Sequence, residues 1–421
     1  MSSVALADII GRQSLDNLKK PTGRARGFPG VAYTSEELLR LENEQLFSRV
    51  WVHAGFAHEL ANPGDTTLAT VADRPLILVC GSDRTIRAFY NSCPHRGAQV
   101  CKRNARKRKN FICPYHTWKF DIDGHLLETP NFSGHGDHRV AGHKVEGLGL
   151  HAVRCDVWHK WVFVNLDGKA PPLVDYMKPF TDRLRGYDFD RLEHGATFTY
   201  EIDTNWKLVQ ENWNEGLHVL TIHPLLNSAE AYYDHSNALD GTYLGTVVDA
   251  GVDASEAPVP LPNFPPLKRG TKLEEQQAQD FVTGFNNISM FPNFKFVAGP
   301  NHATSGSEYA VGPDHVVQRW DVFFLGDAAT KPEYEAARKE VIDFYALTFK
   351  EDKQILETLQ AGHRAGRGGG IFAETWEGTV HHFQRLVVDC LALKKQPFTG
   401  PNRQYRKRTR HGGETSWGRS I

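Results

Sequence analysis

The sequence predicts an α+β protein in which a small antiparallel β domain is inserted into a larger domain of helices and an antiparallel sheet. Three observations lead to this prediction. Short segments with β-type alternation, separated by turn residues, fill the chain from about Trp51 to Leu166. Helical apolar spacing precedes this region at 35–50 and follows it at 205–223 and 331–363. A length of 421 residues exceeds one small β module and suits two domains.

The elements of the first half follow in chain order. Residues 35–50 have helical spacing of leucines, with Ser35 as the expected N-cap. Three segments have the composition of strands, namely 66–71, 75–79 and 161–166. Asp123-Gly124 lies between two short apolar runs and predicts a tight hairpin.

The second half mixes helices and strands. We expect helices at 205–223 and 331–363 and strands near 286–298 and 315–325. The glycine-rich run at 366–370 does not follow a strand or open a helix, so it predicts a loop and no dinucleotide site.

Composition and charge exclude several classes of protein. Apolar residues make up 40% of the chain and charged residues 24%, which is ordinary for a globular protein. A formal net charge of −1 gives no global field that would attract nucleic acid. Six cysteines in a chain of this length do not indicate a disulfide framework. Without a long apolar run or a signal-peptide pattern, we expect a cytoplasmic protein with no membrane or nucleic-acid partner.

Two short motifs indicate a metal centre in the β domain. Cys93 and His95 form C-x-H, and seventeen residues later Cys113 and His116 form C-x-x-H. Two thiolates and two imidazoles can hold a binuclear iron–sulfur cluster with a raised reduction potential. A structural zinc site also uses this ligand set, but zinc signatures usually pair the cysteines in one loop and the histidines in another. Here each loop carries one of each, which favours the cluster.

A second candidate centre lies in the helical segment 205–223. His218 and His223 do not align on an ideal helix, because five residues rotate about 140°. Pro224 biases His223 away from helical geometry and lets it turn toward His218, while Glu215 should share a helical face with His218. Two imidazoles and one carboxylate form the ligand set of non-heme iron(II) enzymes. The alternative is that these histidines only cap or pack.

Together these motifs resemble those of the catalytic α subunit of Rieske-type non-heme iron oxygenases, in which the N-W-K…E-N…H-x4-H pattern begins at Asn205. The resemblance implies a [2Fe-2S] Rieske cluster on Cys93, His95, Cys113 and His116. It further implies a mononuclear Fe(II) held by His218, His223 and an aspartate that maps to Asp352, with Asn212 as a nearby amide and Glu215 as the carboxylate that links the iron to a neighbouring subunit's cluster. From the residues alone, Glu351 and Asp343 remain alternatives to Asp352.

The resemblance also sets expectations for domains and substrate. Residues 1–45 should pack on the catalytic domain, 46–168 should form the Rieske domain and 169–421 the catalytic domain. Most relatives have aspartate at the linking position and tyrosine before the first histidine, where this chain has Glu215 and Leu217. With glutamate at the linking position, the chain resembles the branch of the family that acts on quaternary ammonium compounds. Aromatic compounds are the usual substrates of the family as a whole.

As a mechanism, the resemblance implies O2 activation with electrons from a separate reductase or ferredoxin, so NAD(P)H acts only indirectly. The products expected are those of hydroxylation, cis-dihydroxylation or oxidative demethylation, and the assembly expected is a homotrimer, α3 or α3β3. The alternative function is a Rieske electron carrier without catalysis.

Two further features have open interpretations. Residues 102–109 hold six basic side chains in eight positions, either as a solvated loop or as a docking site for an acidic electron donor. Trp213, Leu217, Phe285, Phe291 and Phe294 either line a substrate pocket or, as is usual for aromatic residues in such segments, pack in the core.

Overall fold

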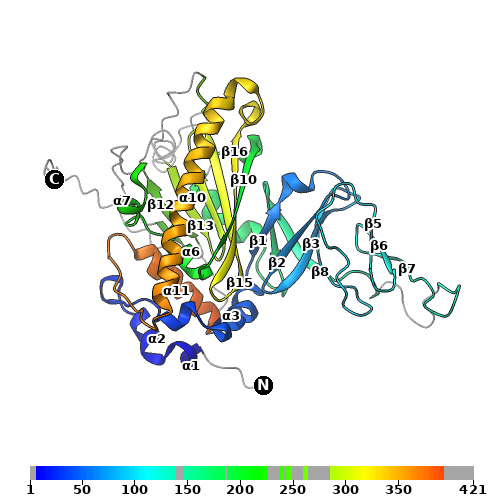
Figure 1. Cartoon of the computed structure of the whole chain (residues 1–421), viewed down its shortest axis with the longest axis horizontal. Helices are drawn as coiled ribbons and strands as arrows, with labels where there is room; N and C mark the ends of the chain where they lie inside the picture. Colours follow the sequence, from blue (N-terminus) through cyan, green and yellow to red (C-terminus); the bar gives the residue numbers. More distant parts are fainter. Residues whose placement is uncertain are drawn as a thin grey trace.

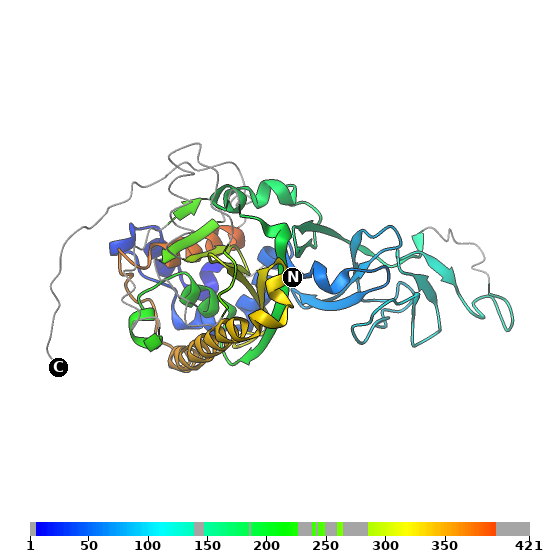
Figure 2. The same cartoon turned by 90° about the horizontal axis from the view of Figure 1, so that it is seen from above.

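The computed structural model describes residues 6–138, 147–184, 187–225, 238–240, 243–248, 259–263 and 285–392. Two large antiparallel sheets organise the described chain, one from each half of the sequence (Figure 1). Figure 2 shows that the first half extends away from the second, with a small third sheet toward its far end. This arrangement confirms the predicted α+β fold with a small antiparallel β domain.

The first sheet has six strands in the order β1-β9-β8-β4-β3-β2. Its strands are β1 (Val52–Phe56), β2 (Thr66–Val71), β3 (Arg74–Cys80), β4 (Ile86–Tyr90), β8 (Ala152–Trp158) and β9 (Trp161–Asn165). The predicted strands at 66–71, 75–79 and 161–166 are therefore confirmed as β2, β3 and β9. β3 and β9 are largely buried apolar segments, so they form the centre of this half.

A three-stranded sheet projects from this domain. The motif of Cys113 and His116 lies between its first two strands, and the motif of Cys93 and His95 lies in the connection that leads to it from β4. The sheet consists of β5 (Asn110–Ile112), β6 (Lys119–Asp121) and β7 (Leu126–Glu128), with the predicted Asp123-Gly124 turn between β6 and β7. Gly124 has φ +90°, and a Cβ there would lie 2.5 Å from the ring of Phe89, so both the turn and the packing require glycine.

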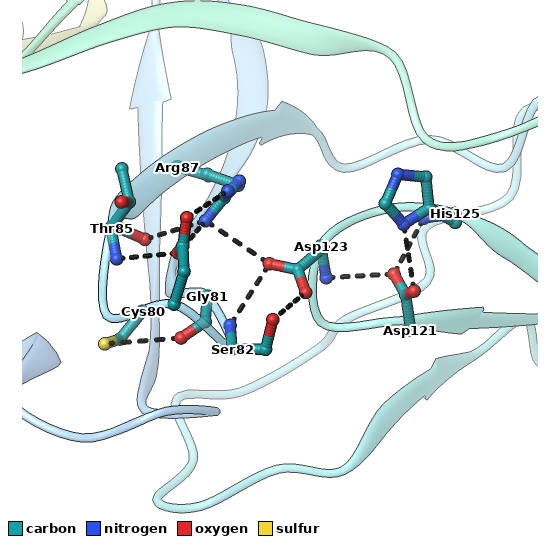
Figure 3. Close-up of polar contacts among 9 residues, drawn as sticks. Cys80, Gly81, Ser82, Thr85, Arg87, Asp121, Asp123 and His125 are labelled. Carbon is teal, nitrogen blue, oxygen red and sulfur yellow. Dashed lines mark hydrogen bonds and ion pairs between the residues drawn. The ribbon is translucent and has the colours of Figure 1, made fainter.

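Polar contacts fasten this hairpin to the six-stranded sheet (Figure 3). Asp123 accepts hydrogen bonds from the amide and the hydroxyl of Ser82 at 3.1 and 2.5 Å, and Arg87 approaches it at 3.3 Å. Asp121 accepts from the amides of Asp123 and His125 and closes the turn. The β3–β4 turn thus sets where the β6–β7 hairpin lies.

The second half is built on a seven-stranded sheet in the order β10-β16-β15-β14-β13-β12-β11. Its strands are β10 (Leu192–Ile202), β11 (Ala238–Asp240), β12 (Tyr243–Val248), β13 (Phe285–Met290), β14 (Phe294–Ala298), β15 (His302–Gly312) and β16 (His315–Leu325). Strands were predicted at β13, β14 and β16, whereas β10 and β15 were missed because both are rich in polar residues. In β15 a Cβ on Gly306 would lie 2.4 Å from the indole of Trp320, so glycine lets that ring lie flat on the strand.

Helices cover this sheet and join it to the N-terminal segment. They are α1 (Leu6–Ile10), α2 (Arg12–Leu18), α3 (Glu36–Glu42), α4 (Leu173–Tyr176), α5 (Lys178–Arg183), α6 (Trp206–Trp213), α7 (Val219–Ile222), α10 (Glu335–His363) and α11 (Gly378–Leu391). The predicted cap is present, because the Ser35 hydroxyl accepts from the Leu38 amide at 3.1 Å, and a π-helical turn, Asn43–Phe47, continues α3. One buried apolar cluster joins the N-terminal helices, the first sheet and α11, through residues such as Leu46, Val164 and Phe383.

Two helices differ in extent from the expectation. The single helix expected over 205–223 is two helices, because the chain leaves α6 at Asn214 and re-enters helix only at Val219. The long helix expected from 331 begins at Glu335 and ends at His363. Among the described residues, none of the helices has the length and hydrophobicity needed to cross a membrane.

Candidate metal centres

The two motif loops of the β domain have the same backbone geometry. In each, the cysteine amide donates at 2.8 Å to the carbonyl five residues later, which belongs to Ala98 in the first loop and Trp118 in the second. In each, the residue four positions after the cysteine returns a hydrogen bond to the cysteine carbonyl and has a positive φ, namely Gly97 (78°) and Thr117 (57°). The two loops therefore share a backbone turn that begins at the cysteine and encloses the histidine.

The four side chains of these loops converge at one end of the domain. Cys93 and Cys113 are both 2% exposed. The rings of His95 and His116 lie 4.7 Å apart, and the indole of Trp118 stacks on His95 at 4.7 Å with an interplanar angle of 5°. This stacking residue was not identified from the sequence, although Trp118 follows the second motif directly.

The donor set fits a binuclear cluster. The Nδ1 atom of His116 is buried and has no hydrogen-bond partner among the described residues, which leaves it available as a ligand. Burial raises the pKa of the Cys93 thiol to about 11, as expected for sulfur that becomes a thiolate only when metal binds. No three of these ligand atoms fall within 4.8 Å of one another, so within the described chain they do not surround a single ion as a zinc site would.

A second group lies between α7 and α10. His218 Nε2 is 3.6 Å and His223 Nε2 is 3.2 Å from the same carboxylate oxygen, Oδ1 of Asp352. One ligand atom from each residue falls within 4.8 Å of the others, so two imidazoles and one carboxylate could hold a metal ion. This is the ligand set of a non-heme iron site with open coordination positions.

Residues behind these three side chains fix their orientation. Asn212 donates to Oδ1 of Asp352 at 2.9 Å. The Nδ1 atoms of both histidines meet carboxylates, His218 with Glu215 at 2.5 Å and His223 with Glu351 at 2.8 Å. A carboxylate on Nδ1 leaves Nε2 free to bind metal and raises its basicity.

These contacts also perturb the acidity of the group. Burial opposes charge on Asp352, but hydrogen bonding and the charges of His223 and His218 hold the pKa of its carboxyl below the usual value. Burial likewise opposes the cationic form of His223, yet the contacts with Asp352 and Glu351 raise its pKa. Without metal, these contacts therefore favour a protonated His223 imidazole beside an ionised Asp352 carboxylate.

The structure separates the candidate third ligands. Asp352 faces the histidines, whereas Glu351 contacts the far side of the His223 ring. Asp343 is 62% exposed and pairs with Lys339 along the same helix. Glu215 contacts His218 as expected, but from the break between α6 and α7 and not from a shared helical face.

The aromatic residues divide between core and site. Phe291 and Phe294 are 1% exposed and belong to apolar clusters, which confirms the core interpretation for them. Trp213 is half-buried and its ring lies 5.0 Å from Trp320, while Leu217 is exposed. The side chain of Phe285 lies outside the described residues.

Another histidine–aspartate group, His58, His194 and Asp321, also has its ligand atoms within 4.8 Å. Its carboxylate is already occupied, because Arg319 donates to both oxygens at 2.7 and 2.9 Å. A bound guanidinium neutralises the carboxylate and repels a second cation. This group is better described as an ion pair that links η4 (Ala57–Leu60) to β10 and β16.

Comparison with known proteins assigns a family to each half of the chain. The chain matches the family models "Rieske [2Fe-2S] domain" over residues 50–141 and "Ring hydroxylating alpha subunit (catalytic domain)" over residues 189–393. It is 28% identical to the carnitine monooxygenase oxygenase subunit of Acinetobacter baumannii, over 86% of this chain and 94% of that protein. It is 27% identical to the anthranilate 1,2-dioxygenase large subunit of Burkholderia cepacia, over 87% and 90% of the two chains.

A solved quaternary ammonium Rieske monooxygenase, described for carnitine oxidation and inter-subunit electron transfer, superposes with a TM-score of 0.72. It is 25% identical, and the match covers 89% of this chain and 97% of that one. Both halves of the chain thus have counterparts in one family. The chain belongs to the Rieske-type non-heme iron oxygenases, as the catalytic α subunit that carries a Rieske cluster and a mononuclear iron.

Proposed function

We propose that this oxygenase subunit monooxygenates a small quaternary ammonium compound of the betaine type. The observation that carries the proposal is the contact of Glu215 with His218 beside Asp352, with glutamate at the linking position. The similarity to carnitine monooxygenase over nearly the full length of both chains supports the same substrate class.

The residue roles we propose follow from the contacts. His218, His223 and Asp352 would hold the mononuclear iron, which supplies O2-activating chemistry when bound. Cys93, Cys113, His95 and His116 would hold the cluster, which supplies single electrons. Asn212 and Glu351 keep the iron ligands oriented. Asn212 donates to Oδ1 of Asp352, and Glu351 contacts Nδ1 of His223, the ring nitrogen opposite the Nε2 atom that would bind the metal.

We further propose a homotrimer in which the cluster of one subunit meets Glu215 of the next. Glu215 Oε1 contacts His218 Nδ1 and retains a second lone pair that could accept from a cluster histidine of a neighbouring subunit. Apolar side chains near the cluster are exposed in the single chain, Tyr115 at 59% and Phe132 at 38%. Phe132 packs at 6.0 Å from His95, so covering these rings would also cover the cluster.

Aromatic rings near the iron group suit a cationic substrate. Trp213 contacts Trp320, and Trp320 stacks on Phe349 at 4.3 Å. Phe349 lies three residues before Asp352 on α10 and therefore on nearly the same face. Trp320 is 1% exposed and Phe349 is 3% exposed, so the half-buried Trp213 is the indole of this group whose face could bind a trimethylammonium group by cation–π attraction. A flat aromatic acid is the second candidate substrate, supported by the similarity to anthranilate dioxygenase.

A substrate screen separates these candidates. The purified chain would be assayed with a surrogate reductase, which passes electrons from NAD(P)H to the cluster. Oxygen uptake coupled to formaldehyde or aldehyde release with carnitine, betaine or choline supports the proposal. Coupled uptake only with aromatic acids, with a dihydroxylated product, supports the second candidate.

Metal analysis tests the oxygenase assignment of the residues. We expect about three irons and two acid-labile sulfides per chain. His218→Ala should abolish turnover and leave the visible absorption of the cluster intact. Two irons in the wild-type chain, with no substrate-dependent oxygen uptake, would instead describe an electron carrier.

A further inference from the structure

Asn214 lies in the break between α6 and α7, directly before Glu215, and is held by three different elements. It is 3% exposed. Its side-chain amide donates to the carbonyl of Gln210 at 2.7 Å, and its side-chain oxygen accepts from Ser289 on β13 at 2.8 Å. Its backbone carbonyl accepts from the hydroxyl of Thr379 on α11. Helix, sheet and C-terminal helix therefore all fix this one residue.

Gln210, which is hydrogen-bonded to Asn214, is in turn hydrogen-bonded to a buried charge pair. The side-chain amide of Gln210 donates to Glu308 Oε1 at 2.5 Å, and Glu308 Oε2 lies 2.7 Å from Lys295 Nζ. Lys295 and Glu308 are at most 1% exposed at their side chains. A charge pair this deep cannot shift without leaving one charge unpaired, so it anchors Gln210 firmly.

The chain just beyond Asn214 is held differently. Glu215 accepts hydrogen bonds from the amides of Leu217 and His218, so its carboxylate moves together with the start of α7. No α-helical hydrogen bonds run through the break from Asn214 to His218. The position of the Glu215–His218 unit relative to Asp352 is thus set where the chain leaves Asn214.

We propose that Asn214 is a positioning residue that holds the Glu215–His218 unit against Asp352. The inference rests on the proposed function, because it takes His218 and Asp352 as iron ligands. Asn214 touches neither iron ligand and acts through Glu215, its neighbour in the chain. Neither metal motif includes this residue.

The experiment measures Fe(II) affinity at the mononuclear site, using full-length protein that retains its cluster and anaerobic equilibrium dialysis with ferrous salt. Asn214→Ala should weaken Fe(II) binding about 10–100-fold, as loss of residues that orient metal ligands does. Ser289→Ala removes one hydrogen bond to Asn214 and should weaken binding by a smaller factor, which keeps the test available if the first variant folds poorly.

Asn165→Ala is the matched control. Asn165 is fully buried and also makes two side-chain hydrogen bonds, to the carbonyl of Val50 and from the amide of Ala170, but it lies in the β domain. It should lower thermal stability and leave Fe(II) affinity unchanged. The proposal is overturned if Asn214→Ala and Ser289→Ala bind Fe(II) as the wild type does, or if Asn165→Ala weakens binding equally. A wild-type chain that binds no iron beyond the cluster overturns the proposed function itself, and this inference with it.

Discussion

Glu215 meets His218 within a single chain, with Oε1 at 2.5 Å from Nδ1 and Oε2 accepting from the His218 amide at 3.1 Å. Glu215, which we propose links the iron to the cluster of a neighbouring subunit, is therefore already hydrogen-bonded to the proposed iron ligand His218. A hydrogen bond to the cluster of the neighbour would complete a short path to the iron through one carboxylate and one imidazole.

Glu215→Gln should interrupt this path even when the iron site is filled. Its amide has one acceptor oxygen where the carboxylate has two, so it cannot serve His218, the start of α7 and a neighbouring histidine together. We expect a fall in turnover of about 10–100-fold that persists when Fe(II) is added to refill the iron site, with the sulfide content unchanged. Single-turnover oxidation of the reduced cluster, followed by visible absorption, would report the slower step.

Glu351→Gln provides the contrast, since Glu351 contacts His223 on the other side of the iron group. It should weaken Fe(II) binding, and added Fe(II) should restore cluster oxidation. If Glu215→Gln is likewise restored by iron alone, the linking role is wrong.

Asp352→Asn should remove the mononuclear iron. The amide lacks the charge that draws both imidazoles and cannot replace a carboxylate ligand for iron(II). Iron should fall from about three to about two per chain with unchanged sulfide. Asp343→Asn, on the exposed face of the same helix, should leave the iron content as it is.

Stability should depend on pH through Glu211 on α6. Burial raises the pKa of its carboxyl from 4.5 to about 7, although Tyr33 at 3.0 Å and Gln384 at 3.0 Å donate hydrogen bonds to it. Because the folded pKa is raised, the stabilisation is complete below pH 4.5 and is lost as the pH rises through 7.

Between pH 5 and 8 the wild-type chain should lose roughly 2 kcal/mol from this group. Glu211→Gln should flatten the dependence, because the amide stays neutral throughout. Thermal unfolding at pH 5.5, 7 and 8 measures the difference. Equal slopes for both proteins would show that Glu211 is ionised to the same extent in the folded and unfolded chains.

Substitutions at the two positive-φ positions of the cluster loops, Gly97 and Thr117, should differ in their effect on stability. Gly97→Ala places a side chain at a φ of 78° and should cost about 1 kcal/mol or more of stability. Thr117→Gly should be close to neutral, because relief of the strained φ of 57° offsets the greater entropy of glycine in the unfolded chain. Thermal unfolding of the cluster-loaded proteins compares them. A loss from Thr117→Gly as large as that from Gly97→Ala would contradict this account.

The basic loop 102–109 lies beside the cluster loops and offers a docking test. Lys102, Arg103, Lys107 and Lys109 are exposed. Arg106 is also exposed, but it bonds to the carbonyl of Glu59, and the partly buried Arg108 lies over Phe111. A group of exposed positive charges raises the association rate with an acidic electron donor at low salt.

Reversing these four exposed charges to glutamate should slow reduction of the cluster by the reductase at low ionic strength and remove its salt dependence. Reduction by dithionite should be unchanged. Charge reversal at Lys19 and Lys20, which directly follow α2 and pair with Asp16 and Asn17, is the control. Identical reductase kinetics in the two variants would exclude a role for the loop.

The sequence determined those features that depend on local patterns. The spacing of Cys93, His95, Cys113 and His116, the Asp123-Gly124 turn and the apolar alternation of the first sheet follow from residue type and neighbours alone. The polar strands β10 and β15 were missed, because their side chains pack against partners contributed by distant segments.

Only the tertiary structure decided which carboxylate completes the second group. Glu351 and Asp352 are neighbours on one helix, and the side that each faces depends on how α10 crosses α7. The break after α6 was likewise decided by tertiary contacts. Residues 205–223 have helical spacing throughout, yet strand β13 and helix α11 hold Asn214 in a position that ends the helix. Local periodicity is a property of neighbouring residues, whereas these outcomes require partners 75 to 165 positions away in the chain.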